Sequence, residues 1–506
     1  MRFKLKLLSI CAVPLLLVSS CAKDDFDNDE IFTHDVRNTE MRTLAASEIN
    51  ISSSADKSRT IVSWPLQYGA LGYKITLTNV SSSNGSEVVV DTIVDGYTIN
   101  LPREADQEYT ISILPLGDKS LSNTNAVMPT LVAFDSYIIG YATIPDNTDL
   151  YTYFKDNPIP DNADELTYDL VKGGKYTISG SLDLGNHWVG LRTLGGEPHA
   201  TITYADGANL QFSNGLTLNN IDFDVKDGKD FLQMSKDPSF AETKLTDANG
   251  GEASSSALHI TNPISISNCN VYDVKNTFIT DNGGKYWVKD LIIKNTLVRF
   301  KTDFSSSDKA INGAAITMNK GGGGVTNLQI SNSTFYNTNE NYAFNYFIQY
   351  GPTGNSYDKF GYASATVSID HCTLYNMMVY VDIDGTMKSG QIANYPGFTK
   401  YTTANFIMTD NIFYQCCPEI AARFLGKRAD LTYATMRFNH NTYYVVNSEG
   451  NLEAESGSSD SHDWDNSGNV IMTDPLFADA ANGDFTISGS EQVAAKTGDP
   501  RWLPEE

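Results

Sequence analysis

The sequence predicts an all-β protein: a right-handed parallel β-helix preceded by a small β-sandwich. Two observations lead to this fold class. From about residue 136 onward, short apolar segments of one pattern recur at coil-length intervals, which is typical of a solenoid. Between residues 38 and 135, short runs of alternating polar and apolar residues are separated by Ser, Asn and Gly turns, which is typical of a sandwich.

The repeat consists of segments in which apolar residues flank a hydrogen-bonding residue. They read LTLNNIDF, ISISNCNVY, LIIKNTLVRF, LQISNSTFY, VSIDHCTLY, FIMTDNIFY and MRFNHNTYY. The hydrogen-bonding position recurs every 27 to 48 residues, as Asn220, Asn268, Asn295, Asn332, His371, Asp410 and His440. In a parallel β-helix each coil lays a strand on the previous one, so this position should form a ladder of turn residues whose side chains point inward and bond to neighbouring backbone. His371 and His440 lie in that register and are predicted as satisfied turn residues rather than catalytic bases.

The ends and the insertions fit the same fold. Residues 173–184 look like the opening coil and residues 148–156 like a short cap over the core, while the C-terminal segment from residue 473 resembles the closing coils of bacterial β-helices. Long insertions in a β-helix build its binding face, and here they are predicted at 225–258, 301–313, 337–362, 385–402 and 447–469.

The region from residue 38 to residue 135 contains five alternating segments. They are RTIVSW (59–64), GYKITLTNV (72–80), SEVVVDTIV (86–94), YTINLP (97–102) and YTISILPLG (109–117). With Trp64 and the late segment beginning at Tyr109, the region resembles a fibronectin type III module. That resemblance implies a seven-strand sandwich acting as a spacer, with a binding role as the alternative.

The first 21 residues form an export signal and not a domain. Three basic residues precede a short apolar run, and Val18-Ser19-Ser20-Cys21 resembles the bacterial lipobox, in which the cysteine is lipidated after cleavage. The alternative is an ordinary signal peptide cut nearby. The acidic residues after Cys21 resemble the tag that sends Bacteroidota lipoproteins to the cell surface, so we expect a lipid anchor in the outer membrane and a tether over residues 22–37.

Charge and cysteine content exclude several classes of protein. Removing Arg2, Lys4 and Lys6 with the signal takes the formal charge from −25 to −28, which argues against nucleic acid as a partner. Four cysteines remain after Cys21, too few for a disulfide framework, and they are predicted to be small core residues.

Two stretches could contact an anionic sugar chain. Residues 285–320 carry a net charge of +4 and include Lys301, Lys309 and Lys320, which stacked coils could align in one stripe. The alternative is a solvated surface whose cations neutralise nearby acids. Residues 342–362 are rich in aromatics, of which Tyr342, Tyr346 and Tyr350 are candidate sugar-stacking residues and Phe344 and Phe347 are predicted core residues.

The order VSIDHCTLY, VDIDG, NIFYQCCPEIAARFLGKR and FNHNTYYV, between residues 367 and 445, resembles the core of calcium-dependent pectate lyases. The family carries a WIDHC-like strand, a DGxxD calcium segment, an Arg-x-Pro-x-x-Arg pair and an HNxF/Y strand. This chain departs from it at Val367, Leu425 and Lys388, which replace the tryptophan, the proline and the second calcium aspartate.

This resemblance implies residue roles for β-elimination from a uronate. Arg423 would be the base, Arg428 and Lys427 carboxylate clamps, and Asp382 and Asp384 ligands of Ca²⁺. An arginine base is chemically difficult because a guanidinium ordinarily stays protonated, and a lysine such as Lys320 or Lys301 would be easier to tune.

Two functions remain open from the sequence. The first is a surface lipoprotein that binds pectin or polygalacturonate for capture and degradation, with a glycan-uptake complex as an expected partner. The second is an active calcium-dependent pectate lyase on the same scaffold. A purely structural or adhesive solenoid is a third, less favoured, alternative.

Overall fold

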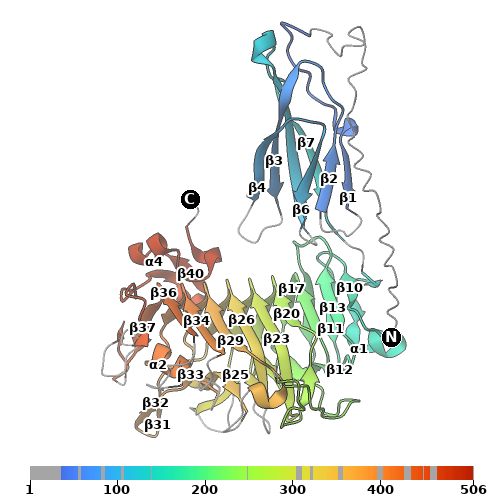
Figure 1. The fold of residues 1–506 in the computed structure, drawn as a ribbon. Helices are drawn as coiled ribbons and strands as arrows, with labels where there is room; N and C mark the ends of the chain where they lie inside the picture. Colours follow the sequence, from blue (N-terminus) through green and yellow to red (C-terminus); the bar gives the residue numbers. More distant parts are fainter. Residues whose placement is uncertain are drawn as a thin grey trace, which may run out of the picture. The chain divides into compact units, whose positions relative to one another are not determined.

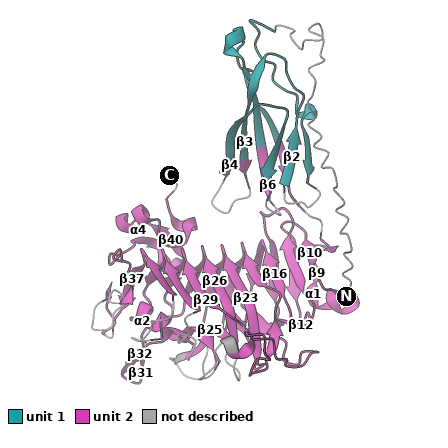
Figure 2. Cartoon of the chain, in the orientation of Figure 1, with its two compact units in different colours: residues 1–77, 90–102, 111–132 teal, residues 78–89, 103–110, 133–506 magenta. Residues whose placement is uncertain are grey.

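The computed structural model describes residues 36–504 except for 55–58, 81–85, 104–106, 138–139, 248, 304–309, 319–322, 352–356, 396–402, 427–434, 448 and 456–463. Its chain divides into two compact units (Figure 2). The first comprises residues 1–77, 90–102 and 111–132, and the second comprises 78–89, 103–110 and 133–506. The predicted tether over residues 22–37 and Cys21 lie almost wholly outside the described residues.

The N-terminal region forms two sheets of three and four strands, as the sequence predicted. The first sheet has the order β1 (Asn50–Ser53), β2 (Arg59–Ser63), β5 (Thr98–Pro102), and the second β4 (Glu87–Val94), β3 (Ala70–Asn79), β6 (Glu108–Gly117), β7 (Thr130–Asp135). Alternation along β6 buries Tyr109, Ile111 and Ile113. Trp64 is buried and contacts Tyr73 at 5.3 Å between ring centroids. The strands β1 and β7 were not recognised in the sequence.

Three long parallel sheets follow and form a right-handed parallel β-helix, which confirms the predicted fold class (Figure 1). Sheet 1 contains β8 (Ala142–Ile144), β10 (Leu166–Leu170), β13 (Val189–Thr193), β16 (Leu216–Asn219), β20 (Ile264–Ser267), β23 (Tyr286–Lys294), β26 (Gly324–Ser331), β29 (Ala365–Asp370), β34 (Ala404–Thr409) and β36 (Thr435–Asn439), with β19 (Leu258–Ile260) paired to β23. Sheet 2 contains β9 (Thr148–Asp149), β11 (Lys175–Ile178), β14 (Ala200–Tyr204), β17 (Ile221–Asp224), β21 (Asn270–Val274), β24 (Leu297–Phe300), β27 (Thr334–Asn337), β30 (Thr373–Tyr375), β35 (Ile412–Tyr414) and β37 (Thr442–Val446), with β38 (Leu452–Ala454) paired antiparallel to β37 at its end. Sheet 3 contains β12 (Ser181–Asp183), β15 (Asn209–Phe212), β18 (Leu232–Met234), β22 (Ile279–Thr280), β25 (Ala310–Met318), β28 (Tyr342–Tyr350) and β33 (Gln391–Asn394).

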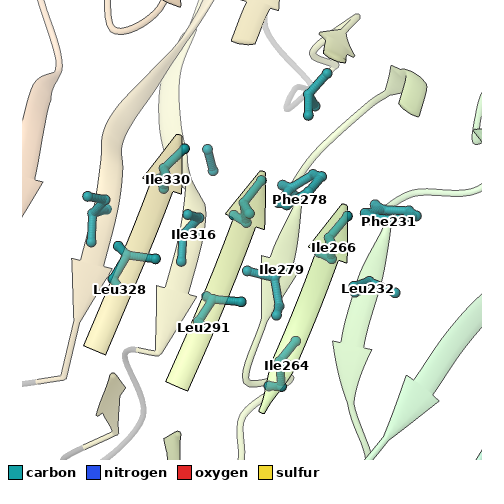
Figure 3. Close-up of a cluster of buried hydrophobic side chains, with 14 of the residues drawn as sticks. Phe231, Leu232, Ile264, Ile266, Phe278, Ile279, Leu291, Ile316, Leu328 and Ile330 are labelled. Carbon is teal, nitrogen blue, oxygen red and sulfur yellow. The ribbon is translucent and has the colours of Figure 1, made fainter. Parts of the chain in front are cut away.

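The core consists of apolar side chains that stack from coil to coil. In sheet 1, Ile264 is in register with Leu291 and Leu291 with Leu328, and all three are fully buried (Figure 3). Burying one such side chain stabilises the fold by about 1.5 to 3 kcal/mol, so the rows hold the coils together and fix their register.

The predicted ladder lies at the corner between sheets 1 and 2. Its members all have left-handed backbone, with φ between 41° and 58°, namely Asn220, Asn268, Asn295, Asn332, His371, Asp410 and His440. This conformation is favoured by Asn and tolerated by Asp and His, which explains the residue types.

The prediction that these seven side chains point inward is wrong, because the inward-facing residue is the next one along the chain. The Asn295 side chain donates to the Asn268 side chain at 3.0 Å on the outer edge of the corner. The fully buried position is the following one, where Asn411 donates to the Ile369 carbonyl at 2.9 Å and Asn441 to the Met408 carbonyl at 2.7 Å. The left-handed residue turns the chain outward, so its successor faces the core.

Helix α1 (Leu150–Asp156) closes the N-terminal end of the core, as predicted. Leu150 is fully buried and Phe154 packs edge-to-face on Tyr168 at 5.0 Å. The coils begin earlier than residue 173, because β8, β9 and β10 already pair within sheets 1 and 2.

The expectation of closing coils at the C-terminus needs correction. The hairpin of β39 (Phe477–Asp479) and β40 (Asp484–Ile487) is antiparallel, and Phe485 packs on Tyr336 and Tyr375 on the outer side of sheet 2. After α4 (Ser490–Ala495) the chain runs back over earlier coils, where Asp499 accepts a hydrogen bond from Thr334 at 2.8 Å. This segment is a strap along the solenoid and not a further coil.

Among the described residues, no helix has the length and apolar character needed to cross a membrane.

Candidate functional site

The outer face of sheet 3 carries one continuous row of polar side chains. Strand register aligns the row coil by coil, through Asp183, Gln211, Gln233, Thr280, Thr317, Gln349 and Asn394. Each of these residues is exposed or half-buried, whereas the adjacent residues Leu210, Leu232 and Ile316 are fully buried in the core. Six steps of about 4.8 Å between strands make the row about 29 Å long.

Hydrogen bonds preorganise the row near its N-terminal end. The Gln211 amide donates to Asn209 at 2.9 Å and to Gln233 at 3.3 Å, and Gln233 donates to Asp230 at 2.8 Å. Amide groups both donate and accept, which suits the hydroxyl groups of a sugar chain. Apart from the carboxylate of Asp183, the row is therefore an uncharged hydrogen-bonding surface that repeats at the strand spacing.

The insertions expected to build a binding face enter or leave sheet 3. Residues 235–257 leave β18, residues 301–309 lead into β25, residues 351–364 leave β28, and residues 395–403 leave β33. The hairpin of β31 (Val381–Ile383) and β32 (Thr386–Lys388) precedes β33, and α2 (Ile420–Phe424) packs against β33 (Figure 1). The segment 447–469 follows β37 of sheet 2, and its residue Leu452 packs on a small cluster that includes Ala343 of β28.

Arg423 lies in α2 beside β33. Its Nε donates to the Glu419 carboxylate at 3.0 Å, one helical turn earlier, and its Nη1 lies 3.4 Å from Gln391 Oε1. A guanidinium stays protonated in proteins, so an arginine held in an ion pair is poorly suited to act as a general base. This geometry suits a carboxylate or hydroxyl clamp. Lys427 and Arg428 lie outside the described residues.

Asp382 and Asp384, the predicted calcium ligands, both lie exposed on the β31–β32 hairpin. Asp384 and Gly385 have φ of 53° and 77° and form the two-residue turn, which explains the Asp-Gly pair by backbone geometry alone. Within the described part of the chain, the group of side chains close enough to hold a metal ion is a different one, Asp370, His371 and Asp410. Calcium binding at the hairpin stays a prediction.

The three candidate tyrosines lie on β28 but differ in exposure. Tyr342 and Tyr346 are half-buried, and Tyr346 is in register with Gln391 next to Arg423. Tyr350 is only 4% exposed and packs within the core, where burial raises its pKa, so its position argues against the predicted ligand contact. Phe344 and Phe347 are fully buried, as predicted.

The described lysines and arginines of this run lie on different sheets, and the alignment of Lys301 with Lys309 and Lys320 stays a prediction. Lys289 and Lys294 belong to sheet 1, Arg299 belongs to sheet 2, and Lys301 is exposed at the entrance to sheet 3, so the run winds around the solenoid. Arg299 pairs with Asp273 at 2.8 Å and Lys285 with Glu242 at 3.2 Å, which is the neutralising role given as the alternative. Lys309 and Lys320 lie outside the described residues.

Sequence reasoning missed the polar row of sheet 3. Gln233 and Thr280 lie on strands that the pattern assigned to loops or did not mark, since two or three residues are too few to predict a strand. The one feature of the sequence that pointed to this face was the position of the predicted insertions, most of which do flank sheet 3.

Three family models match the chain, each described as a domain of unknown function. They are DUF4992 over residues 1–173, DUF4957 over residues 174–338 and DUF5123 over residues 367–502. No curated protein matches.

Among solved structures, the chain is similar to pectate lyase PelI from Erwinia chrysanthemi in complex with tetragalacturonic acid (10% identity, 68% of this chain and 87% of that chain, TM-score 0.13). It is also similar to pectate lyase Pel3 from Pectobacterium carotovorum (11%, 70% and 96%, TM-score 0.21) and to a second PelI structure (9%, 71% and 99%, TM-score 0.14). TM-scores this low carry no argument, so the fold assignment rests on the strand register given above.

Proposed function

We propose that this protein binds an extended acidic polysaccharide, such as pectin or polygalacturonate, along the outer face of sheet 3. The observation that carries the proposal is the row of aligned hydroxyl, amide and carboxylate side chains from Asp183 to Asn394. A regular polymer can repeat the same hydrogen bonds at successive coils, which a small ligand cannot do.

The acidic character of the ligand is proposed from the C-terminal end of this face. Arg423 forms an ion pair with Glu419 and lies beside β33, and Lys388 and Lys301 are exposed near the strands that border it. A guanidinium forms charge-assisted hydrogen bonds with a uronate carboxylate. The half-buried Tyr346 lies in the same region and offers an aromatic ring to a sugar.

Binding without cleavage is the better-supported form of this function. Elimination from a uronate needs a base, whereas a guanidinium stays protonated in proteins and that of Arg423 is engaged with the Glu419 carboxylate. The lyase alternative therefore lacks support at the residue that the family resemblance selected.

We further propose that the protein is displayed on the outer membrane through lipid on Cys21, with a glycan-uptake complex as its expected partner. The support is the export signal, the lipobox-like segment and the acidic residues that follow it. A Cys21→Ala variant should leave the membrane fraction and should no longer incorporate radiolabelled palmitate. A variant that is still labelled and still bound to the membrane would contradict the lipid anchor.

The binding proposal is tested by electrophoresis in gels that contain polygalacturonate. The wild-type protein should be retarded, and a Gln233→Ala/Gln349→Ala variant should lose most of the retardation. Gln329→Ala is the matched control, because Gln329 is an exposed glutamine on the outer side of sheet 1. Equal retardation of all three proteins would refute binding on sheet 3.

Ultraviolet absorbance of the same polymer separates binding from cleavage. With Ca²⁺ present, the proposal expects a flat trace from a protein that is retarded in the gel. Absorbance that grows with time and stops on adding a chelator would establish the lyase alternative instead.

A further inference from the structure

The corner between sheets 1 and 2 changes its chemistry along the solenoid. The first four ladder positions are asparagines, whereas the last three are His371, Asp410 and His440. All seven share the left-handed backbone that asparagine adopts readily, so the turn itself does not require the change. Three consecutive coils thus carry side chains that can ligate a metal ion, at a position that asparagine occupies in the earlier coils.

These side chains converge at the end of β29. One ligand atom each from Asp370, His371 and Asp410 lies within 4.8 Å of the other two, and all three residues are half-buried. His371 Nδ1 lies 3.2 Å from Asp370 Oδ1, and His440 Nδ1 lies 3.2 Å from Asp410 Oδ1. The second histidine therefore contacts the cluster through Asp410.

We propose that Asp370, His371 and Asp410 form a binding site for a divalent transition metal ion such as Zn²⁺. One imidazole and two carboxylates supply three ligands, and water completes the shell. The imidazole selects a borderline metal over Ca²⁺, which prefers oxygen ligands. Ligand atoms about 2.0 to 2.2 Å from Zn²⁺ lie closer together than 4.8 Å, so small side-chain rotations close the site.

Neighbouring groups support the carboxylates of this cluster. Thr409 donates a short hydrogen bond to Asp370, and Asn439 donates to Asp410 at 3.2 Å. Such contacts orient metal ligands. By contrast, the positive charge of Arg437 on β36 acts on Asp370 and opposes the binding of a metal ion there.

The site is independent of the proposed polysaccharide face. It lies at the corner between sheets 1 and 2, whereas the polar row lies on sheet 3. Loss of metal binding and loss of polysaccharide binding are therefore separate outcomes in separate variants.

The test is a calorimetric titration of the purified protein with ZnCl₂. The wild type should bind one Zn²⁺ at this cluster. His371→Asn and Asp410→Asn should each weaken that binding at least about tenfold. Both replacements install the residue found at the other ladder positions, so they remove a ligand while keeping the turn.

His187→Asn is the matched control, because His187 is a partly exposed histidine bonded to Asn162 in an early coil. Its Zn²⁺ affinity should equal that of the wild type. The proposal is overturned if the wild type shows no saturable binding, or if both His371→Asn and Asp410→Asn bind Zn²⁺ as the wild type does. If circular dichroism shows that one of these two variants does not fold, the Zn²⁺ affinity of the other variant decides the test.

Discussion

Replacing Asn411 by alanine should destabilise the solenoid strongly. The Asn411 side chain is fully buried, its amide donates to the Ile369 carbonyl at 2.9 Å, and its oxygen accepts from the Cys372 backbone N–H at 2.9 Å. The same amide also donates to Asn441 at 3.0 Å, so one side chain joins three consecutive coils.

The magnitude follows from the groups that lose their partners. Alanine leaves the Ile369 carbonyl and the Cys372 N–H buried without these hydrogen bonds, and each such group costs about 1 to 3 kcal/mol. We therefore expect a loss of about 2 to 6 kcal/mol in the free energy of unfolding, which is large against a typical total of about 5 to 15 kcal/mol.

The assay is urea unfolding followed by far-ultraviolet circular dichroism. Asp410→Asn is the control, because this adjacent half-buried residue keeps its turn conformation as asparagine, and its unfolding midpoint should stay close to that of the wild type. A loss below about 1 kcal/mol in Asn411→Ala would refute the view that this buried amide locks the coils.

Three further predictions concern the described part of the chain. The pKa of His371 is raised by its hydrogen bond to Asp370, so the pair stabilises the fold below the unfolded pKa of about 6.5 and this contribution is lost as pH rises through the folded value. Urea unfolding should therefore show a larger deficit for His371→Asn at acidic than at alkaline pH, and a deficit independent of pH would exclude the pair as its source. Burial raises the pKa of the thiols of Cys269, Cys372, Cys416 and Cys417, so mass spectrometry after iodoacetamide treatment should find them alkylated only in denaturant, and rapid native labelling would contradict their core position. Phe154→Ala should cost about 3 to 5 kcal/mol locally, because α1 loses its contact with Tyr168, and hydrogen exchange should accelerate in β10 and β11 while β34 stays protected.

The repeat predicted sheets 1 and 2 because each coil carries a strong signal there. A hydrogen-bonding residue between two apolar segments marks the left-handed turn, as at Asn295 between β23 and β24. The pattern could not tell which residue after the strand faces inward, since that depends on the sign of φ at the turn. The buried Asn411 and Asn441 were therefore missed beside Asp410 and His440.

Sheet 3 was harder to predict because its strands are short or lie inside insertions. β22 has two residues and β18 has three, so neither shows a period, and burial along the longer β28 does not alternate strictly either. Of the predicted site residues, Arg423 and Tyr346 do lie near Gln391 on this side. The cluster at His371 was read as turn residues only, because the contact of Asp370 and His371 with Asp410 joins side chains about 40 positions apart in the sequence.

The most direct test of polysaccharide binding on sheet 3 is calorimetric titration with galacturonic acid oligomers of increasing length. The polar row of about 29 Å predicts that affinity rises with each added sugar until the oligomer spans the row, then levels off. The Gln233→Ala/Gln349→Ala variant should lose this rise, while Gln329→Ala should keep it. Affinity that is independent of length, or that rises equally in the double variant, would contradict an extended ligand on this face.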